Sequence, residues 1–367
     1  MRKKEWLLLI LAVFVIAGAA FGLYTYRTAQ GGKAPSSATP TTNQAEASQG
    51  AQAKEELPAG TPSVKLWVTR DFGATVLFNQ QVAWHEGDTV MDLLKKNITN
   101  VETAYNGGFV QSINGMASQY RVGDANSKKV DWFFSVNGLM SDVGAGEYPV
   151  HQGDTIWWDY HNWDYAMRVP AQIGAFPHPF VTRVTGEPLK AQIMYAGNQE
   201  QAAQQLNESL SQKVNKNTKN SPGKGSTYSV SKWNEKLFEQ EQGLILIGDR
   251  PSLMASPFVQ KMMREREALG LFASFTDKGI QTYDSSGKPS KLLTDDGDAV
   301  ILATKNLGNE MPILIVTGNS DAVLSKAVEQ LQQTENSETP FQLMYSAVLS
   351  GDQVMRLPME TNKGTTP

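Results

Sequence analysis

The chain has no cysteine among its 367 residues. Disulfide bonds, thiolate metal sites, cysteine nucleophiles and lipid attachment to an N-terminal cysteine are therefore excluded. Histidine is scarce as well, and the residues concerned are His85, His151, His161 and His178. They lack the i, i+4 spacing and the acidic partner that are typical of a metal centre. We predict neither a structural metal nor an intrinsic cofactor.

The chain also lacks an excess of positive charge. Its formal net charge is -4, and charged residues make up 19% of the sequence. Such a balance provides no general attraction to polyanions, so a nucleic-acid partner is not expected. The hydrophobic fraction of 40% is ordinary for globular proteins, and the length suits two domains of roughly 100 to 200 residues each.

A long apolar run, residues 6–26, follows three basic residues at positions 2–4. At about 1.5 Å per helical residue, the run is long enough to cross a hydrocarbon core of about 30 Å. We therefore predict a membrane anchor or signal segment over residues 1–27. The basic cluster would stay cytoplasmic, which makes this a single-pass cell-membrane protein with extracytoplasmic domains. The small residues at 17–19 leave the alternative of a cleaved signal peptide and a secreted protein.

Residues 28–62 contain mainly Ala, Gln, Ser, Thr, Pro and Gly. A segment with so few large apolar side chains cannot offset the entropy lost on ordering. We predict a flexible, disordered stalk here, and a disordered tail over residues 359–367.

The first folded domain is predicted over residues 63–168. Two runs typical of strands, 64–69 and 75–84, flank a turn, and Asp88 can cap the helix that follows. Apolar and polar residues then alternate over 132–136 and 156–160, which predicts two further strands. This order of elements indicates a small α+β domain with one helix packed on a mixed sheet.

A proline-rich connector, residues 169–188, separates this domain from a second one over residues 189–358. The second part alternates between patterns typical of strands and of helices. Strands are expected at 191–195, 243–248, 271–275, 299–303 and 313–317, and helices at 199–214, 257–269 and 321–332. Such alternation predicts an α/β domain with a largely parallel sheet.

Four segments of the first domain resemble the transcobalamin-like C-terminal domain family. They read FVQSING at 109–115, DWFFSVNG at 131–138, GAGEY at 144–148 and GDTIWWDY at 153–160. The resemblance implies a β-grasp fold, and in transcobalamin and intrinsic factor such a domain covers one face of bound cobalamin. The helical barrel that completes those carriers is absent here, together with the histidine that ligates cobalt in some of them.

Aromatic residues and a histidine gather at 157–165, where a strand leads into a loop. Flat aromatic faces beside polar groups suit a large planar ligand or a sugar ring. The predicted ligand-binding residues are Phe133, Asn137, Trp157, His161, Trp163 and Tyr165. Two alternatives stay open: the aromatic side chains pack between the domains, and Asn137 serves the turn that it forms with Gly138.

No catalytic arrangement or cofactor fingerprint stands out, so we predict that the protein is not an enzyme. The first hypothesis is a membrane-anchored protein that captures a small molecule, a corrinoid such as cobalamin, for a membrane uptake system. The alternative is a structural or adhesion module of the cell envelope that binds protein or glycan.

Overall fold

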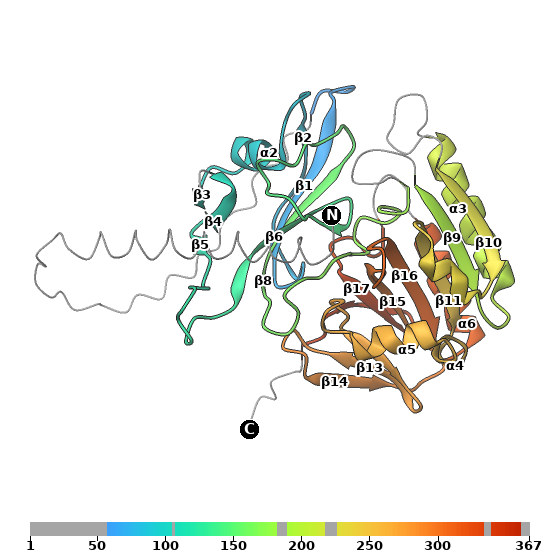
Figure 1. Ribbon diagram of the computed structural model, residues 1–367. Coiled ribbons are helices and arrows are strands. Elements are labelled where there is room, and N and C mark those ends of the chain that lie inside the picture. Colours follow the sequence, from blue (N-terminus) through green and yellow to red (C-terminus); the bar gives the residue numbers. More distant parts are fainter. Residues whose placement is uncertain (1–56, 105–106, 182–188, 217–225, 334–338, 361–367) are drawn as a thin grey trace, which may run out of the picture. The chain divides into compact units, whose positions relative to one another are not determined.

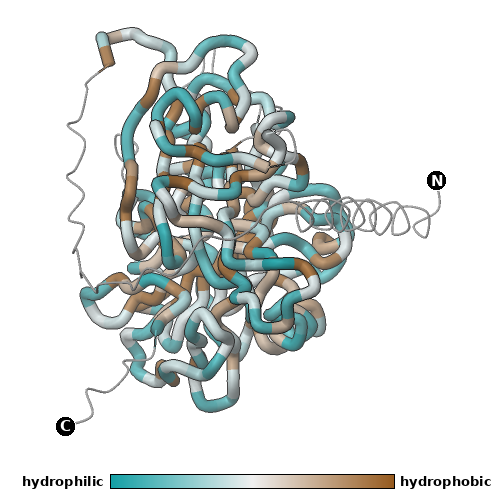
Figure 2. Tube along the Cα trace, turned by 90° about the vertical axis from the view of Figure 1, so that its left-hand side faces the viewer, coloured by the Kyte–Doolittle hydropathy of each residue, from teal (hydrophilic) through white to brown (hydrophobic). Residues whose placement is uncertain are grey.

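The computed structural model describes residues 57–104, 107–181, 189–216, 226–333 and 339–360 (Figure 1). Strands outnumber helices in this part of the chain, and 19% is helical. The described residues within 57–120 and 127–360 belong to one compact unit. In the tube view, hydrophobic residues recur along the inner strands and hydrophilic residues along many outer turns (Figure 2).

The first sheet is five-stranded, in the order β2-β1-β8-β6-β7. Its strands are β1 (Ser63–Arg70), β2 (Thr75–Ala83), β6 (Val130–Val136), β7 (Leu139–Met140) and β8 (Thr155–Asn162). β1 and β8 are parallel, and the other neighbours are antiparallel. A small antiparallel sheet of β3 (Val101–Ala104), β4 (Phe109–Ile113) and β5 (Met116–Ala117) precedes β6.

Helix α2 (Val90–Asn97) contributes Val90, Leu93 and Leu94 to the core of the first sheet. Its N-cap is Thr89, which forms a capping box with Asp92, and not Asp88 as the sequence suggested. Asp88 instead accepts a hydrogen bond from the amide of His85 and pairs with Lys96.

The second sheet is seven-stranded, in the order β10-β9-β11-β16-β15-β17-β18. Its strands are β9 (Lys190–Tyr195), β10 (Thr227–Lys232), β11 (Gly243–Asp249), β15 (Asp298–Lys305), β16 (Pro312–Gly318), β17 (Ser346–Ser350) and β18 (Gln353–Leu357). The pairings β10–β9, β9–β11 and β11–β16 are parallel. The remaining three pairings are antiparallel.

The predicted fold class, a β-grasp domain followed by an α/β domain with a largely parallel sheet, is therefore wrong. The chain consists of antiparallel and mixed sheets. The physical reason lies between β15 and β16, which only residues 306–311 separate. A parallel pair needs a crossover of a dozen or more residues, so these neighbouring strands form an antiparallel hairpin instead.

Helices pack on the second sheet and contribute to two hydrophobic clusters. They are α3 (Glu200–Lys216), α4 (Arg250–Met254), α5 (Pro257–Arg264) and α6 (Asp321–Gln332), with a 3-10 turn at Glu235–Glu239. α3 and α6 join one cluster, whereas α4 and α5 join the other. The second cluster also includes Trp67 and Trp157 of the first sheet and Phe72 of the turn after β1, so the two sheets share part of their core.

No helix in the described part of the chain is long and apolar enough to cross a bilayer. The span predicted at 1–27 lies outside the described residues, as do most of the predicted stalk and of the tail. The prediction of a single-pass membrane protein with extracytoplasmic domains is corrected accordingly, because the described residues provide no helix that supports it.

A separate antiparallel sheet, β12 (Ala273–Thr276), β13 (Gly279–Tyr283) and β14 (Pro289–Leu293), packs beside α5. At Gly279 an added Cβ would lie 2.2 Å from the carbonyl oxygen of Leu293. The strands approach so closely there because glycine has no side chain.

We expect Gly279→Ala to lower the free energy of unfolding by about 1 to 3 kcal/mol, because backbone atoms would have to move apart. Gly144→Ala is the matched control, since its Cβ would meet an ordinary contact of 3.5 Å to the oxygen of Gly108. Urea unfolding followed by tryptophan fluorescence measures both. Equal stability of the two variants would contradict the close strand packing described here.

Candidate ligand pocket

The carboxylate of Asp159, on β8, is buried and accepts hydrogen bonds from several directions. The backbone amides of Phe72 and Gly73 donate to it, each at 3.0 Å. The hydroxyl of Thr69 also donates to Asp159 and accepts a hydrogen bond of 2.7 Å from the indole of Trp157. This carboxylate thus ties β8 to the turn that follows β1.

That turn holds two consecutive residues in the left-handed region, Asp71 with φ 58° and Phe72 with φ 57°. This conformation is unfavourable for a bulky residue such as phenylalanine and persists only where the surroundings enforce it. The hydrogen bonds to Asp159 supply that constraint. They fix the positions of the Asp71 and Phe72 side chains.

His161 lies next to Asp159 on the same side of β8. Its Nδ1 is 2.8 Å from Oδ2 of Asp159, and a carboxylate oxygen only accepts, so Nδ1 carries the proton. The imidazole is stacked between Phe72, at a centroid distance of 4.4 Å, and Phe133, at 4.6 Å. Side chains of the same chain therefore cover both faces of the His161 ring.

Tyr345 closes the other side of this cluster. Its hydroxyl is 3.5 Å from Nδ1 of His161, and its ring meets Trp157 edge-on at 4.9 Å. Burial, the negative charge of Asp159 and a hydrogen bond to that carboxylate raise the pKa of Tyr345 well above its ordinary value. The phenol therefore stays neutral at physiological pH and serves as a donor.

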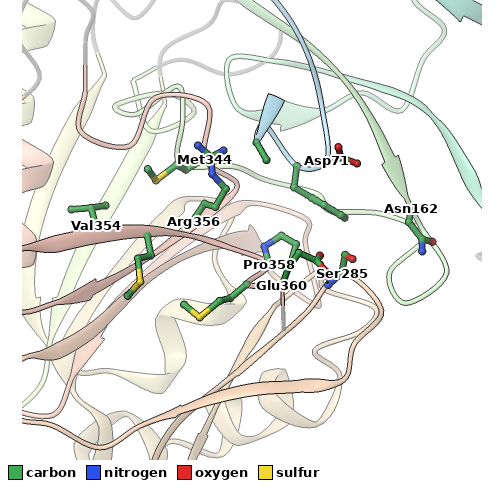
Figure 3. A pocket seen from close by; sticks show the side chains of 12 residues that line it. Asp71, Asn162, Ser285, Met344, Val354, Arg356, Pro358 and Glu360 are labelled. Carbon is green, nitrogen blue, oxygen red and sulfur yellow. Dashed lines mark hydrogen bonds between the residues drawn. The ribbon is translucent and has the colours of Figure 1, made fainter. Parts of the chain in front are cut away.

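A pocket of about 720 Å³ lies against this cluster. It is lined by Asp71, Phe72, Ala74, Asn162, Ser285, Met344, Val354, Met355, Arg356, Pro358, Met359 and Glu360. In Figure 3, Asp71 and Asn162 lie on one side of the pocket, and Met344 and Val354 on the other. Phe72 belongs both to the wall and to the buried cluster, so the strained turn shapes the pocket directly.

The pocket wall combines apolar and charged side chains. Arg356 is half-buried and donates a hydrogen bond of 3.2 Å to the carbonyl of Leu343. Burial lowers the pKa of Arg356 somewhat, and the charge of Asp159 opposes this shift. No carboxylate of the described residues lies within ion-pair distance of Arg356.

Two carboxylates also line the pocket. Burial, together with the charges of Asp159 and Glu360, raises the pKa of Asp71, although Arg70 acts in the opposite direction. The side chain of Asp71 remains 63% exposed, so it is accessible to a ligand. Glu360 is exposed and accepts a hydrogen bond from the amide of Ser285.

Three of the residues predicted to bind a ligand, Phe133, Trp157 and His161, come together in the buried cluster behind the pocket. Trp157 is 2% and His161 3% exposed, and Phe133 is half-buried against the imidazole. Their aromatic faces are occupied by other side chains of the chain.

Asn137 lies outside this cluster, in the turn between β6 and β7, where its φ is 53°. Its side chain donates to Asp154 at 2.7 Å and accepts from the amide of Thr155 at 2.9 Å. The amide therefore joins β6 to the start of β8 and is not part of the pocket.

Trp163 and Tyr165 are half-buried in the loop after β8. The indole of Trp163 donates to Asp131 at 2.7 Å and meets the ring of Tyr120 edge-on. The hydroxyl of Tyr165 donates to the carbonyl of Leu271 at 3.1 Å. Neither residue lines the pocket.

Sequence reasoning missed most of the lining residues, above all those that follow β17. Met359 and Glu360 even fell in the predicted tail. The one signal available was Asp71-Phe72-Gly73, where two non-glycine residues occupy a tight turn between two strands. Among the described residues, no three His, Asp or Glu side chains meet as potential metal ligands.

One comparison with known proteins covers the segment from α2 to the end of β8. Residues 87–162 match a family described as a domain of unknown function, DUF4430, and this segment includes Asp159 and His161. No curated protein matches. The resemblance to the transcobalamin-like family stays a prediction.

Among solved structures, the chain is similar to a "putative metal binding protein" from Ruminococcus gnavus ATCC 29149. The identity is 15%, and the match covers 27% of this chain and 96% of the other. The TM-score is 0.21, too low for any conclusion about fold or function.

We expect Asp159→Asn to lower the free energy of unfolding by about 2 to 5 kcal/mol. The asparagine side chain replaces one acceptor oxygen of the carboxylate by an NH₂ group, which cannot accept a hydrogen bond. A buried backbone amide of the turn that loses its acceptor costs roughly 1 to 3 kcal/mol. Urea unfolding measures the change. Asp164→Asn, which alters an exposed carboxylate beside Lys129, is the control and should change little. Similar midpoints for the two variants would contradict the role given to Asp159.

Proposed function

We propose that this protein binds a small amphipathic ligand in the pocket between the turn at 71–74 and strand β18. The observation that supports this most is the guanidinium of Arg356, which has no ion-pair partner among the described residues and lies in a wall that is otherwise largely apolar. A volume of about 720 Å³ suits a small molecule, since ligand pockets commonly measure roughly 300 to 1,000 Å³.

The apolar part of the ligand would contact Met344, Val354, Met355 and Met359. Methionine side chains are unbranched and polarizable, so they adapt to ligands of irregular shape. The ring of Phe72 adds a flat surface that the strained turn holds in place. This wall favours a bulky, partly apolar body over a small polar metabolite.

The charged part of the ligand would be an anionic group on Arg356. A guanidinium forms bidentate hydrogen bonds with carboxylate or phosphate, and here it has no competing ion pair among the described residues. Asp71 and Glu360 line the same pocket and would repel a ligand of purely negative charge. We therefore favour a zwitterionic ligand whose cationic group faces these carboxylates.

A corrinoid remains our specific candidate, and a pocket of about 720 Å³ would hold only one part of so large a molecule. Cobalamin carries a phosphate and a positively charged cobalt-corrin ring, which meets the requirement for a bulky body with charges of both signs. Delivery of such a ligand to a membrane uptake system stays part of the hypothesis. The aromatic residues of 157–165 do not support a corrinoid ligand, because their side chains contact other residues of the chain.

We propose binding and not catalysis because of the position of the His161–Asp159 pair. This pair would be the natural acid-base catalyst near the pocket, yet both side chains are buried and the imidazole is enclosed by two phenylalanine rings. A substrate in the pocket would meet Phe72 before it reached the imidazole.

The test is isothermal titration of the protein with cobalamin, cobinamide and a set of amphipathic zwitterions and organic anions. We expect saturable binding of at least one of these ligands. Arg356→Gln should weaken it about tenfold or more, the equivalent of a charge-assisted hydrogen bond of roughly 1.5 to 3 kcal/mol.

Arg264→Gln is the control, because this exposed arginine on α5 does not line the pocket. Its affinity should equal that of the unmodified chain. Binding that is the same in both arginine variants would place the ligand elsewhere, and no binding across the whole set would contradict the proposal. Unchanged melting temperatures would show that both variants fold.

A further inference from the structure

The outer strand of the first sheet, β2, has one pairing edge that no other strand of the described residues occupies. Among the described residues β2 pairs only with β1, so the N–H and C=O groups along the other edge of this nine-residue strand have no strand partner. Such an edge is a ready template for another strand. Natural proteins usually protect a free edge with charged side chains, proline, shortness or a bulge.

β2 carries little of this protection. It reads TVLFNQQVA, without a charged residue or proline. The other outer strands of five or more described residues each carry a cation: Lys232 on β10, Lys291 on β14 and Arg356 on β18. A bulge does interrupt the pairing of β2 with β1, but it lies near the start of β2. From Phe78 to Ala83 the register is regular.

β2 also exposes apolar side chains. Val76 is 50% and Leu77 37% exposed, and the amide side chains of Asn79 and Gln81 are exposed further along the strand. Apolar groups beside an open backbone edge are what a neighbouring strand would cover. Both features favour a partner in the form of an extended strand.

We infer that β2 pairs with β2 of a second copy of this chain, antiparallel across a two-fold axis. In such a contact every residue faces a residue of the same strand, so charges of one sign would oppose each other. A strand with no charge at all avoids this repulsion. The two sheets then form one continuous sheet of ten strands, twice the five of a single copy. A contact between two strand edges buries less surface than the roughly 800 Å² per partner that is typical of a stable dimer. The affinity is therefore low, and the dimer forms only at high protein concentration.

Sedimentation velocity of the full chain over a concentration series tests the inference. We expect the mass to rise towards a dimer in the unmodified chain. Leu77→Lys and Asn79→Lys should remain monomeric, with unchanged melting temperatures, because both positions are exposed. Gln353→Lys, at an exposed position of the outer strand β18, is the matched control and should dimerise normally. Association that persists in both β2 variants would overturn the inference.

The absence of cysteine allows a second, independent test, because a single introduced thiol is the only one present. Asn79→Cys, at the centre of β2, should give a disulfide-linked dimer on mild oxidation. Thr75→Cys and Ala83→Cys should cross-link far less, since antiparallel pairing separates equal residues towards the strand ends. Equal cross-linking at all three positions would indicate parallel pairing and overturn the two-fold arrangement. Cross-linking no stronger than that of Gln353→Cys would overturn the contact itself.

Discussion

The buried carboxylate of Asp159 is the constraint on which the pocket depends. Two consecutive residues of the turn after β1 adopt a left-handed conformation that costs free energy for a side chain as large as that of Phe72. The turn keeps it because the amides of Phe72 and Gly73 donate hydrogen bonds to this carboxylate. Once the turn is fixed, Phe72 lies against His161 on one side and the pocket on the other, so one charge connects the strained backbone, the buried cluster and the ligand wall.

The same arrangement explains why β8 is buried on both faces. Ile156, Trp158 and Tyr160 face the core shared with α2, as the alternating pattern predicted. Trp157 and His161 point the other way, where Tyr345 of the second part of the chain packs against both and Phe72 of the turn after β1 stacks on His161. A single strand thus joins two hydrophobic cores, which leaves few of its aromatic side chains available to a ligand.

The local elements of this fold followed well from the sequence, whereas their pairing did not. Strands appear where residues 64–69, 299–303 and 313–317 predicted them, and a helix begins at Asp321. Periodicity reports burial and local conformation, but not the direction of the neighbouring strand. The loop at 306–311 did contain that information, because its length alone rules out a parallel crossover. The alternating pattern was given more weight than the loop, and the predicted parallel sheet was wrong for that reason.

The pocket was harder to predict because it is assembled from distant segments. Asp71 and Arg356 are brought together only when the turn after β1 meets the strand β18, and neither residue belongs to a recognisable motif. An aromatic cluster such as that of 157–165 attracts attention as a ligand platform, yet aromatic side chains bury large areas and are equally suited to joining two cores. The feature that distinguishes a binding residue here is a half-buried cation without an ion-pair partner among the described residues. That feature depends on which groups surround the side chain, and therefore appears only in the folded structure.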